Sequence, residues 1–321
     1  MVKFMAYMRL VRLPILVLIA FIQFNVRHFL IEPMLVINGY KLIMSDMHFS
    51  LLVLATIFIA AGGYAINDYF DVKVDRINKL KQVIIDRHIK RRVAMMLHIL
   101  LTATGFMLAS YVSWKLGMWK ITALFIFAIF TLWFYSTSLK HQFLSGNLAI
   151  ALMASFVPLI VGLFEIPLQN QAHPESIQEL GYSIFNVPAF WVIGYAIILF
   201  LLTLIREITK DVIDLRGDRI YGSKTIPIQT GIKTTKYILI GLYAAFGAIF
   251  SWFYFDYLSV HTGMTTLFFI VALLLVFEII LIIRARTKPH FLYSANLNNL
   301  ITLLIILSTY FIKVSIETYF M

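Results

Sequence analysis

Residues 51–77 read LLVLATIFIAAGGYAINDYFDVKVDRI, an apolar run that passes directly into a motif of alternating acids and bases. A bilayer-crossing helix needs roughly 20 mostly apolar residues, and the run that ends before Asn67 has that length. The carboxylates that follow it lie where such a helix would leave the membrane. The stretch therefore predicts a membrane-spanning helix that carries polar chemistry at one end.

The composition of the whole chain agrees with a membrane protein. Of its 321 residues, 61% are hydrophobic and 13% are charged, whereas soluble domains average about 45–50% apolar and about 25% charged residues. The chain contains no cysteine, which excludes disulfides, thiolate nucleophiles and cysteine-ligated metals. It also contains no P-loop, dinucleotide-binding, serine-hydrolase or zinc-protease motif. These observations favour a multi-span membrane protein.

Nine apolar runs are long enough to cross a bilayer. They cover approximately residues 11–31, 48–67, 94–113, 117–135, 144–164, 185–205, 236–256, 264–283 and 296–317. The sequence therefore predicts an all-α bundle of about nine transmembrane helices.

The charges predict how these spans face the membrane. The chain has 27 basic and 16 acidic residues and a net charge of +11. Most of the basic residues lie at the N-terminus or in the connections after the even-numbered spans, and such an asymmetry marks the cytoplasmic side. We expect a multi-pass protein of the cell (inner) membrane with a cytoplasmic N-terminus and no nucleic-acid partner. Residues 165–182 contain no lysine or arginine, which predicts an outer loop.

Residues 211–220, DVIDLRGDRI, repeat the pattern of residues 68–77, DYFDVKVDRI. The two copies follow the second and the sixth span, four spans apart. A repeat at this interval indicates two four-helix halves of like orientation, about 1–143 and 144–286, with the ninth span added. We therefore expect residues 1–321 to form a single membrane-embedded domain.

Each copy of the repeat carries three aspartates at helical positions 0, 3 and 7, which fall within an arc of roughly 60°. They are Asp68, Asp71 and Asp75 in the first copy and Asp211, Asp214 and Asp218 in the second. Like charges packed this closely need bound cations or bound protons. Clustered carboxylates suit Mg²⁺, which substrate phosphates commonly complete, and nearby bases can hold the remaining phosphate oxygens. The repeat therefore predicts a magnesium–diphosphate site at the cytoplasmic face.

Two other interpretations of the acidic repeat stay open. Carboxylates mixed with lysine and arginine at a membrane surface also form solvated, salt-bridged rims. Ion-coupled transporters also contain internal repeats, but they place their acids near the bilayer midplane. Here the acids lie at one membrane face among bases, which favours a diphosphate site over a translocation path.

Two of the charged residues within the predicted spans are candidates for a role inside the membrane. Arg27 lies in the first span and Glu278 in the eighth. Charged side chains are costly inside a bilayer, so both are candidates for a function. If the first span is shorter than drawn, Arg27 instead reaches outward to the membrane surface.

The repeat resembles the acidic motifs of the UbiA superfamily of intramembrane prenyltransferases. The resemblance rests on N-D-x-x-D-x-x-x-D from Asn67 to Asp75 and on D-x-x-D-x-x-x-D from Asp211 to Asp218. Further matches are Tyr135-Ser136, Leu139-Lys140, Gly146-Asn147 and the segment from Arg9 to Pro14. The pattern D-x-x-G-D-R-x-x-G-x-K-T-x-P-I over residues 214–228 most resembles the digeranylgeranylglyceryl phosphate synthase branch.

The resemblance implies a funnel of helices that opens to the bilayer and holds the tail of a polyprenyl diphosphate, with two Mg²⁺ ions at its cytoplasmic end. The metal ligands that it implies are Asp68, Asp71, Asp211 and Asp214. Asp75 and Asp218 hold metal or orient Arg76 and Arg219. The other expected substrate contacts are Asn67, Lys81, Lys140 and Lys224 at the diphosphate and the rings of Tyr64 and Tyr135 at the allylic cation.

One segment departs from the family pattern. Many members follow the first motif with an Arg-Pro pair and a glycine-rich turn, whereas residues 78–92 read NKLKQVIIDRHIKRR. This difference leaves the acceptor open. A glycerol-phosphate lipid is favoured by residues 214–228, and an aromatic acid or quinone precursor is the alternative. A non-catalytic scaffold that keeps the fold is a third interpretation.

Overall fold

A computed structural model describes residues 2–78, 83–174, 183–259 and 262–320. In those residues the chain is helical almost throughout, as predicted. The long helices are α2 (Leu13–Asn25), α4 (Asp46–Asn78), α5 (Arg91–Lys115), α6 (Thr122–Thr137), α7 (Ser145–Ala172), α9 (Asn186–Ile220), α10 (Ile226–Phe253), α11 (Thr262–Arg284) and α12 (Lys288–Phe320). The shorter elements are α1 (Val2–Leu10), α3 (Glu32–Val36), the π-helical turns η1 (Val26–Ile31) and η4 (Tyr254–Leu258), and the 3-10 turns η2 (Trp119–Ile121) and η3 (Leu139–His141).

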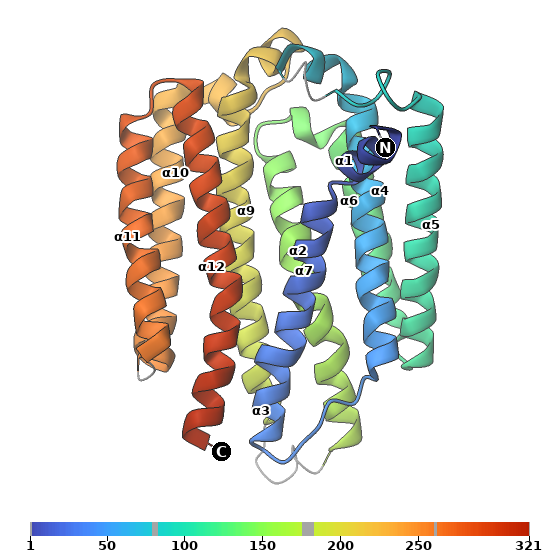
Figure 1. The fold of residues 1–321 in the computed structure, drawn as a ribbon, viewed down its shortest axis with the longest axis vertical. Coiled ribbons are helices and arrows are strands. Elements are labelled where there is room, and N and C mark those ends of the chain that lie inside the picture. Colours follow the sequence, from blue (N-terminus) through green and yellow to red (C-terminus); the bar gives the residue numbers. More distant parts are fainter. Residues whose placement is uncertain (1, 79–82, 175–182, 260–261, 321) are drawn as a thin grey trace.

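The long helices run side by side as one bundle (Figure 1). Within the described ranges, nine helical segments are long and apolar enough to cross a membrane, which confirms the predicted number of spans. The N-terminal end lies near one end of the bundle and the C-terminal end near the other. This placement agrees with an odd number of crossings.

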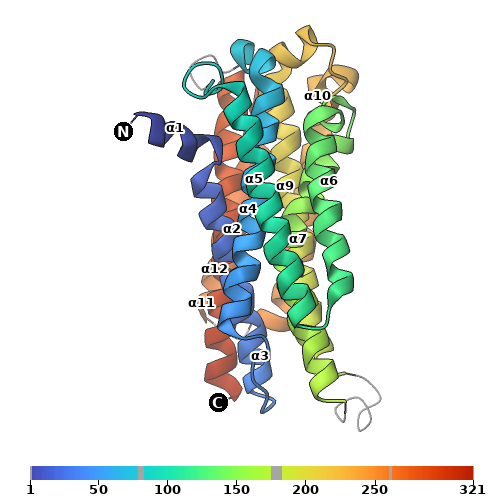
Figure 2. The same ribbon diagram turned by 90° about the vertical axis from the view of Figure 1, so that its right-hand side faces the viewer.

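The helix α1 projects from one side of the bundle instead of running along it (Figure 2). It meets α2 at Arg12, whose left-handed backbone (φ 54°) makes the sharp change of direction. Proline at the start of α2 suits this elbow because the first turn of a helix needs no backbone N–H from that residue. The elbow therefore brings Arg9 and Arg12 to the end of the bundle where α4 and α9 carry their acidic residues.

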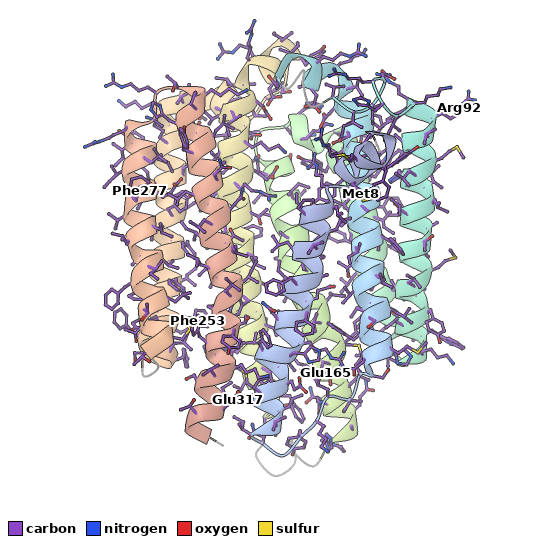
Figure 3. The ribbon with its side chains drawn as sticks, viewed as in Figure 1. Met8, Arg92, Glu165, Phe253, Phe277 and Glu317 are labelled. Atoms are coloured by element: carbon purple, nitrogen blue, oxygen red, sulfur yellow. The ribbon has the colours of Figure 1, made fainter. Side chains whose placement is uncertain are left out.

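The nitrogen and oxygen atoms of the side chains gather towards that same end of the bundle, where Arg92 also lies (Figure 3). The helices α4 and α9 continue beyond their apolar runs as far as Asn78 and Ile220. Both acidic motifs are therefore helical, as the spacing of their aspartates requires.

At the opposite end of the bundle, the structure corrects the prediction made for one acidic residue. Residue Glu165 was expected in an outer loop, but it lies fully buried inside α7, which runs on to Ala172. Its carboxylate accepts hydrogen bonds from the backbone N–H of Ile43 (2.6 Å) and Met44 (3.2 Å). The carboxylate thus anchors the segment that connects the first two spans.

Arg27 and Glu278 both bond to other residues of the protein. Arg27 is 1% exposed and does not reach the membrane surface. Its guanidinium donates to the carbonyl of Met44 (2.6 Å) and pairs with Asp46 (2.9 Å). The carboxylate of Glu278 accepts hydrogen bonds from Tyr243 (3.2 Å) and Ser294. Arg27 thus joins the first span to the start of α4, and Glu278 joins α11 to α10 and α12. Neither residue lines the cavity at the acidic motifs.

Candidate active site

The ends of α4 and α9 are joined by one side chain. The amide of Asn78 donates to the carbonyl of Asp214 (3.0 Å) and accepts from the N–H of Gly217 (2.9 Å). A Cβ atom at Gly217 would lie 2.5 Å from this amide, closer than real Cβ contacts allow. The glycine therefore lets Asn78 reach the backbone of α9 in the middle of the second motif, and the two motifs come together.

The two motifs line a single cavity of about 640 Å³ at this end of the bundle. The aspartates that line it are Asp68, Asp71, Asp75, Asp211, Asp214 and Asp218. Among the other predicted site residues, Asn67, Tyr135 and Lys140 line it as well. The fold thus places nine of the predicted residues around one space, although the motifs lie far apart in sequence.

Two aspartates of the first motif are held by side chains from two other segments and by Asn67 of α4 itself. The Arg12 guanidinium donates to Asp68 (3.1 Å). The Asp71 carboxylate accepts from the amide of Asn67 (2.9 Å) and from the ammonium of Lys140 (2.5 Å). These charge-assisted bonds fix the carboxylates in place and offset part of their mutual repulsion.

The second motif is held from α7. The amide of Asn147 donates to Asp211 (2.8 Å). The preceding residue, Gly146, lies against η3, because a Cβ atom there would be 2.7 Å from Cα of Lys140 and 2.8 Å from the carbonyl oxygen of Leu139. The start of α7 therefore positions an amide for one motif and, through η3, the lysine for the other.

We expect Gly146→Ala to lower the rate of the reaction at this site by roughly tenfold to a hundredfold, because misplacing a positioning group by about 1 Å can cost this much. The added methyl would meet backbone atoms, so η3 has to shift and Lys140 moves from Asp71. Initial rates of transfer by purified protein measure the effect. The matched control is Gly241→Ala on α10, where a Cβ would meet nothing within 4 Å. Unchanged activity in Gly146→Ala would show that the position of η3 does not matter.

The side chain of His141 extends this arrangement to the loop after α9. Its ring Nδ1 lies 2.9 Å from the hydroxyl of Ser223, and its carbonyl accepts from the N–H of Lys224 (2.7 Å). Burial and the adjacent Lys140 ammonium lower the pKa of His141. The neutral imidazole that results adds no further positive charge to the cavity at neutral pH.

A second, largely apolar chamber lies on the membrane side of the acidic cavity. Its lining includes Tyr64, and it shares Arg12, Asn67, Tyr135 and Lys210 with the acidic cavity. The Arg12 guanidinium lies over the Tyr64 ring, with Cζ 4.7 Å from the ring centre. The two spaces meet at these residues, so an elongated molecule with a charged head and an apolar tail fits across both.

Three predicted substrate contacts do not line this cavity, and a fourth lies outside the described residues. Residue Lys81 is outside the described residues. Arg76 is exposed and pairs with Asp86 (3.4 Å). The side chains of Arg219 and Lys224 are exposed and do not line the cavity. Arg76 and Arg219 each follow an aspartate of the acidic face by one residue, which on a helix turns them about 100° away from it.

Several residues at the site were not among the predicted site residues, although Arg12 and Asn147 belong to matched segments of the sequence. They are Arg12, Asn78, Asn147, Arg206, Glu207 and Lys210. A signal for two of them was present in the repeat. Extended one turn upstream, it places Lys210 opposite Asn67 and Glu207 opposite Tyr64. The positions just before both acidic motifs therefore also face the site.

The residues around the cavity fit magnesium that is completed by a substrate. No group of three acidic or histidine side chains in the described parts of the chain is close enough to cage a metal on its own. The donor set is nevertheless carboxylate oxygen, and the buried Oδ1 of Asn67 has no hydrogen-bond partner. Magnesium is commonly held by one or two carboxylates, water and substrate phosphates, and this cavity offers those carboxylates.

The fold and the site together define a polytopic membrane protein in which a cavity lined by two acidic motifs opens onto an apolar chamber. The chain belongs to the UbiA prenyltransferase family, whose sequence model matches residues 39–300. The family suggested by the two motifs is therefore confirmed.

Several curated relatives are digeranylgeranylglyceryl phosphate synthases. The protein from Thermococcus kodakarensis is 30% identical over 195 residues, which is 60% of this chain and 61% of that protein. The protein from Methanobrevibacter smithii is 32% identical over 201 residues, 61% of this chain and 63% of that protein. The chain thus matches less than two thirds of the length of these relatives.

Solved structures of the family share the fold along the whole chain. A structure of digeranylgeranylglyceryl phosphate synthase in membranes has a TM-score of 0.65 at 20% identity and covers 98% of this chain and 100% of its own. A UbiA homologue from Archaeoglobus fulgidus bound to GPP and Mg²⁺ has a TM-score of 0.58 at 16% identity, covering 95% and 99%. The fold is therefore that of a UbiA-type membrane protein.

Proposed function

We propose that this protein transfers a geranylgeranyl-type group from its diphosphate to a lipophilic acceptor in a magnesium-dependent reaction, with a glycerol-phosphate lipid as the favoured acceptor. The observation that carries the proposal is that both acidic motifs line one cavity that opens onto an apolar chamber. The same chemistry is supported by the similarity to digeranylgeranylglyceryl phosphate synthases. It is also supported by the structure of a UbiA homologue bound to GPP and Mg²⁺.

The donor would lie with its diphosphate among the aspartates and its tail in the chamber. Magnesium bound among these aspartates would neutralise the charge on the departing diphosphate. The Lys140 ammonium and the Arg12 guanidinium, which border the cavity, add positive charge on the same side. These residues therefore favour cleavage of the bond between the allylic carbon and the diphosphate oxygen.

The diphosphate leaves with the electron pair of that bond, and positive charge develops on the allylic carbon. The aromatic side chains Tyr64 and Tyr135 line the chamber, and aromatic ring faces can stabilise a cation. The acceptor hydroxyl attacks the carbon and forms the new C–O bond, and its proton passes to an oxygen of the departed diphosphate. The apolar chamber limits the access of water, which would otherwise give the free prenyl alcohol.

The depth of the chamber agrees with a donor of the geranylgeranyl class. Along α4 its lining runs from Asn67 to Thr56, which at the rise of an α-helix is roughly 16 Å. An extended isoprene unit contributes four chain bonds and spans roughly 5 Å. About three units therefore lie below Asn67, and a fourth reaches the acidic cavity.

Filling the deep end of the chamber should shorten the preferred donor. We expect Thr56→Phe to lower kcat/KM for geranylgeranyl diphosphate by roughly tenfold or more and to leave geranyl diphosphate within about twofold, since a pocket discriminates by this order for each unit excluded. Competition between the two donors, read by mass spectrometry of the products, measures the ratio. The control is Thr266→Phe on an exposed position of α11. An equal loss with both donors would contradict this assignment of the chamber.

The proposed function is tested by transfer of radiolabelled geranylgeranyl from its diphosphate in membranes that contain the protein, with a glycerol-phosphate lipid or an aromatic acid as acceptor. We expect labelled lipid product and release of diphosphate. A wild-type protein that releases no diphosphate but drives substrate flux in proteoliposomes would instead support a transporter. A protein that shows no Mg²⁺-dependent binding of a prenyl diphosphate analogue would support a scaffold.

The orientation and the internal organisation belong to the same proposal. We place the N-terminus and the acidic cavity on the cytoplasmic side of the cell membrane, because most basic residues lie at that end. Residues 1–321 would form one domain whose two four-helix halves, about 1–143 and 144–286, each supply one acidic motif. Labelling of single cysteines by an impermeant thiol reagent tests the orientation in a chain that has no cysteine of its own.

A further inference from the structure

Three charged residues lie on α9 just before the second acidic motif. The carboxylate of Glu207 is almost fully buried and bonds to the guanidinium of Arg206 (3.2 Å) and to the ammonium of Lys210 (3.3 Å). About a third of each basic side chain remains exposed. Because both residues line the apolar chamber, their charged groups are accessible from it.

The balance of charge at these residues differs from that in the acidic cavity. There, Arg12 is paired with Asp68, and Lys140 is paired with Asp71. In the described part of α9, two cations share the single carboxylate of Glu207. The charged residues that line the apolar chamber are therefore three bases, Arg12, Arg206 and Lys210, and one acid, Glu207. Arg206 is the one of these bases that lines the chamber only and shares its carboxylate with another cation, and a charge held in apolar surroundings is costly unless an anion offsets it.

The location of this excess charge fits a substrate anion other than the donor diphosphate. Lys210 lines both spaces, whereas Arg206 and Glu207 line the apolar chamber only. In a glycerol-phosphate lipid the phosphate and the free hydroxyl sit on neighbouring carbons. The phosphate must therefore bind within roughly 5 Å of the reacting hydroxyl, on the membrane side of the donor diphosphate.

We infer that Arg206 and Lys210 bind the phosphate of the acceptor lipid, and that Glu207 is a positioning residue that holds the two cations side by side. This inference rests on the proposed function. The planar guanidinium can donate two parallel hydrogen bonds to a phosphate, and the ammonium adds a third. The acceptor's phosphate is thereby held at the junction of the two spaces, with its neighbouring hydroxyl facing the allylic carbon of the donor.

The test compares a glycerol-phosphate lipid with the same lipid lacking its phosphate, in wild type and in Arg206→Gln. We expect wild type to prefer the phosphorylated acceptor by roughly a hundredfold in kcat/KM, and Arg206→Gln to lose most of that preference through a higher KM for that acceptor. The KM for the prenyl diphosphate should stay within about twofold. Arg206→Lys, which keeps the charge, should recover part of the preference.

The matched control is Arg216→Gln, which removes an exposed arginine from the same helix outside both spaces and should keep the preference. An Arg206→Gln protein that loses activity equally with both acceptors, or keeps the wild-type preference, would overturn the inference. Hydroxybenzoate is tested as a third acceptor in the same assay, to separate a phosphate site from a carboxylate site. If wild type preferred this aromatic acid to the phosphorylated lipid, phosphate recognition would be contradicted.

Binding measurements separate failure of this inference from failure of the proposed function. Wild type and Arg206→Gln are titrated with the phosphorylated lipid in nanodiscs in the presence of a non-hydrolysable prenyl diphosphate analogue. If Arg206→Gln binds the lipid more weakly than wild type does, while both proteins bind the analogue equally well, the phosphate site is supported even if no product forms. Equal binding of the lipid to both proteins contradicts it.

Discussion

Replacing Asp68 or Asp211 with asparagine is expected to lower prenyl transfer by about a thousandfold, the order of effect seen when one group that stabilises developing charge is removed from an enzyme. Asparagine keeps the shape of the side chain and removes the negative charge that a metal requires. The two residues lie on different helices, Asp68 beside Arg12 and Asp211 beside Asn147. Initial rates with a geranylgeranyl diphosphate donor measure both variants.

The control for this pair is Asp256→Asn, an exposed aspartate in η4 outside the two spaces. It should transfer at the wild-type rate. If either site variant kept more than about a tenth of the wild-type rate, its carboxylate would not be part of the diphosphate site. If only the Asp68 variant lost activity, the two motifs would not act on one substrate, and the proposed function would need a single-motif site.

The acidic site was predictable because its information is local. Three aspartates at helical spacing lie on one face of any helix that contains them, and the repeat showed that two such helices exist. The joining of those helices was not predictable. It depends on Asn78 reaching the backbone beside Gly217, a contact between segments far apart in sequence that no spacing rule describes.

The basic residues show why nearness in sequence is a weak guide to a site. Arg76 and Arg219 adjoin the motifs but point away from their acidic faces. By contrast, Arg12 lies in a different span and reaches Asp68 because its left-handed backbone turns the chain at that point. Such a backbone conformation in a non-glycine residue is uncommon, so it could not be expected from the sequence.

The buried acid of α7 shows a different limit. The absence of lysine and arginine from residues 165–182 predicts a loop at Glu165. The helix nevertheless continues through Pro167. The backbone N–H groups of Ile43 and Met44 bind the carboxylate, which allows this acid to lie inside the bundle.

The removal of magnesium is expected to have an effect as large as that of the aspartate variants. Transfer should fall by about a thousandfold in EDTA, because without the metal the departing diphosphate lacks its counter-charge. Excess Mg²⁺ should restore the transfer. Ca²⁺ should restore it poorly, since it prefers more ligands at longer distances than Mg²⁺. Activity that is indifferent to EDTA would contradict the proposed chemistry.

The arrangement of the carboxylates also predicts when the metal binds. In the described residues no three ligating side chains form a ready-made cage, and Asp68 and Asp71 already bond to Arg12 and Lys140. Mg²⁺ alone should therefore shift the thermal midpoint of the protein little, whereas Mg²⁺ with a non-hydrolysable prenyl diphosphate should raise it by several degrees, because a ligand stabilises only the state that binds it. In Asp211→Asn the combined shift should vanish. An equal shift with Mg²⁺ alone would show a metal site that is complete without the donor.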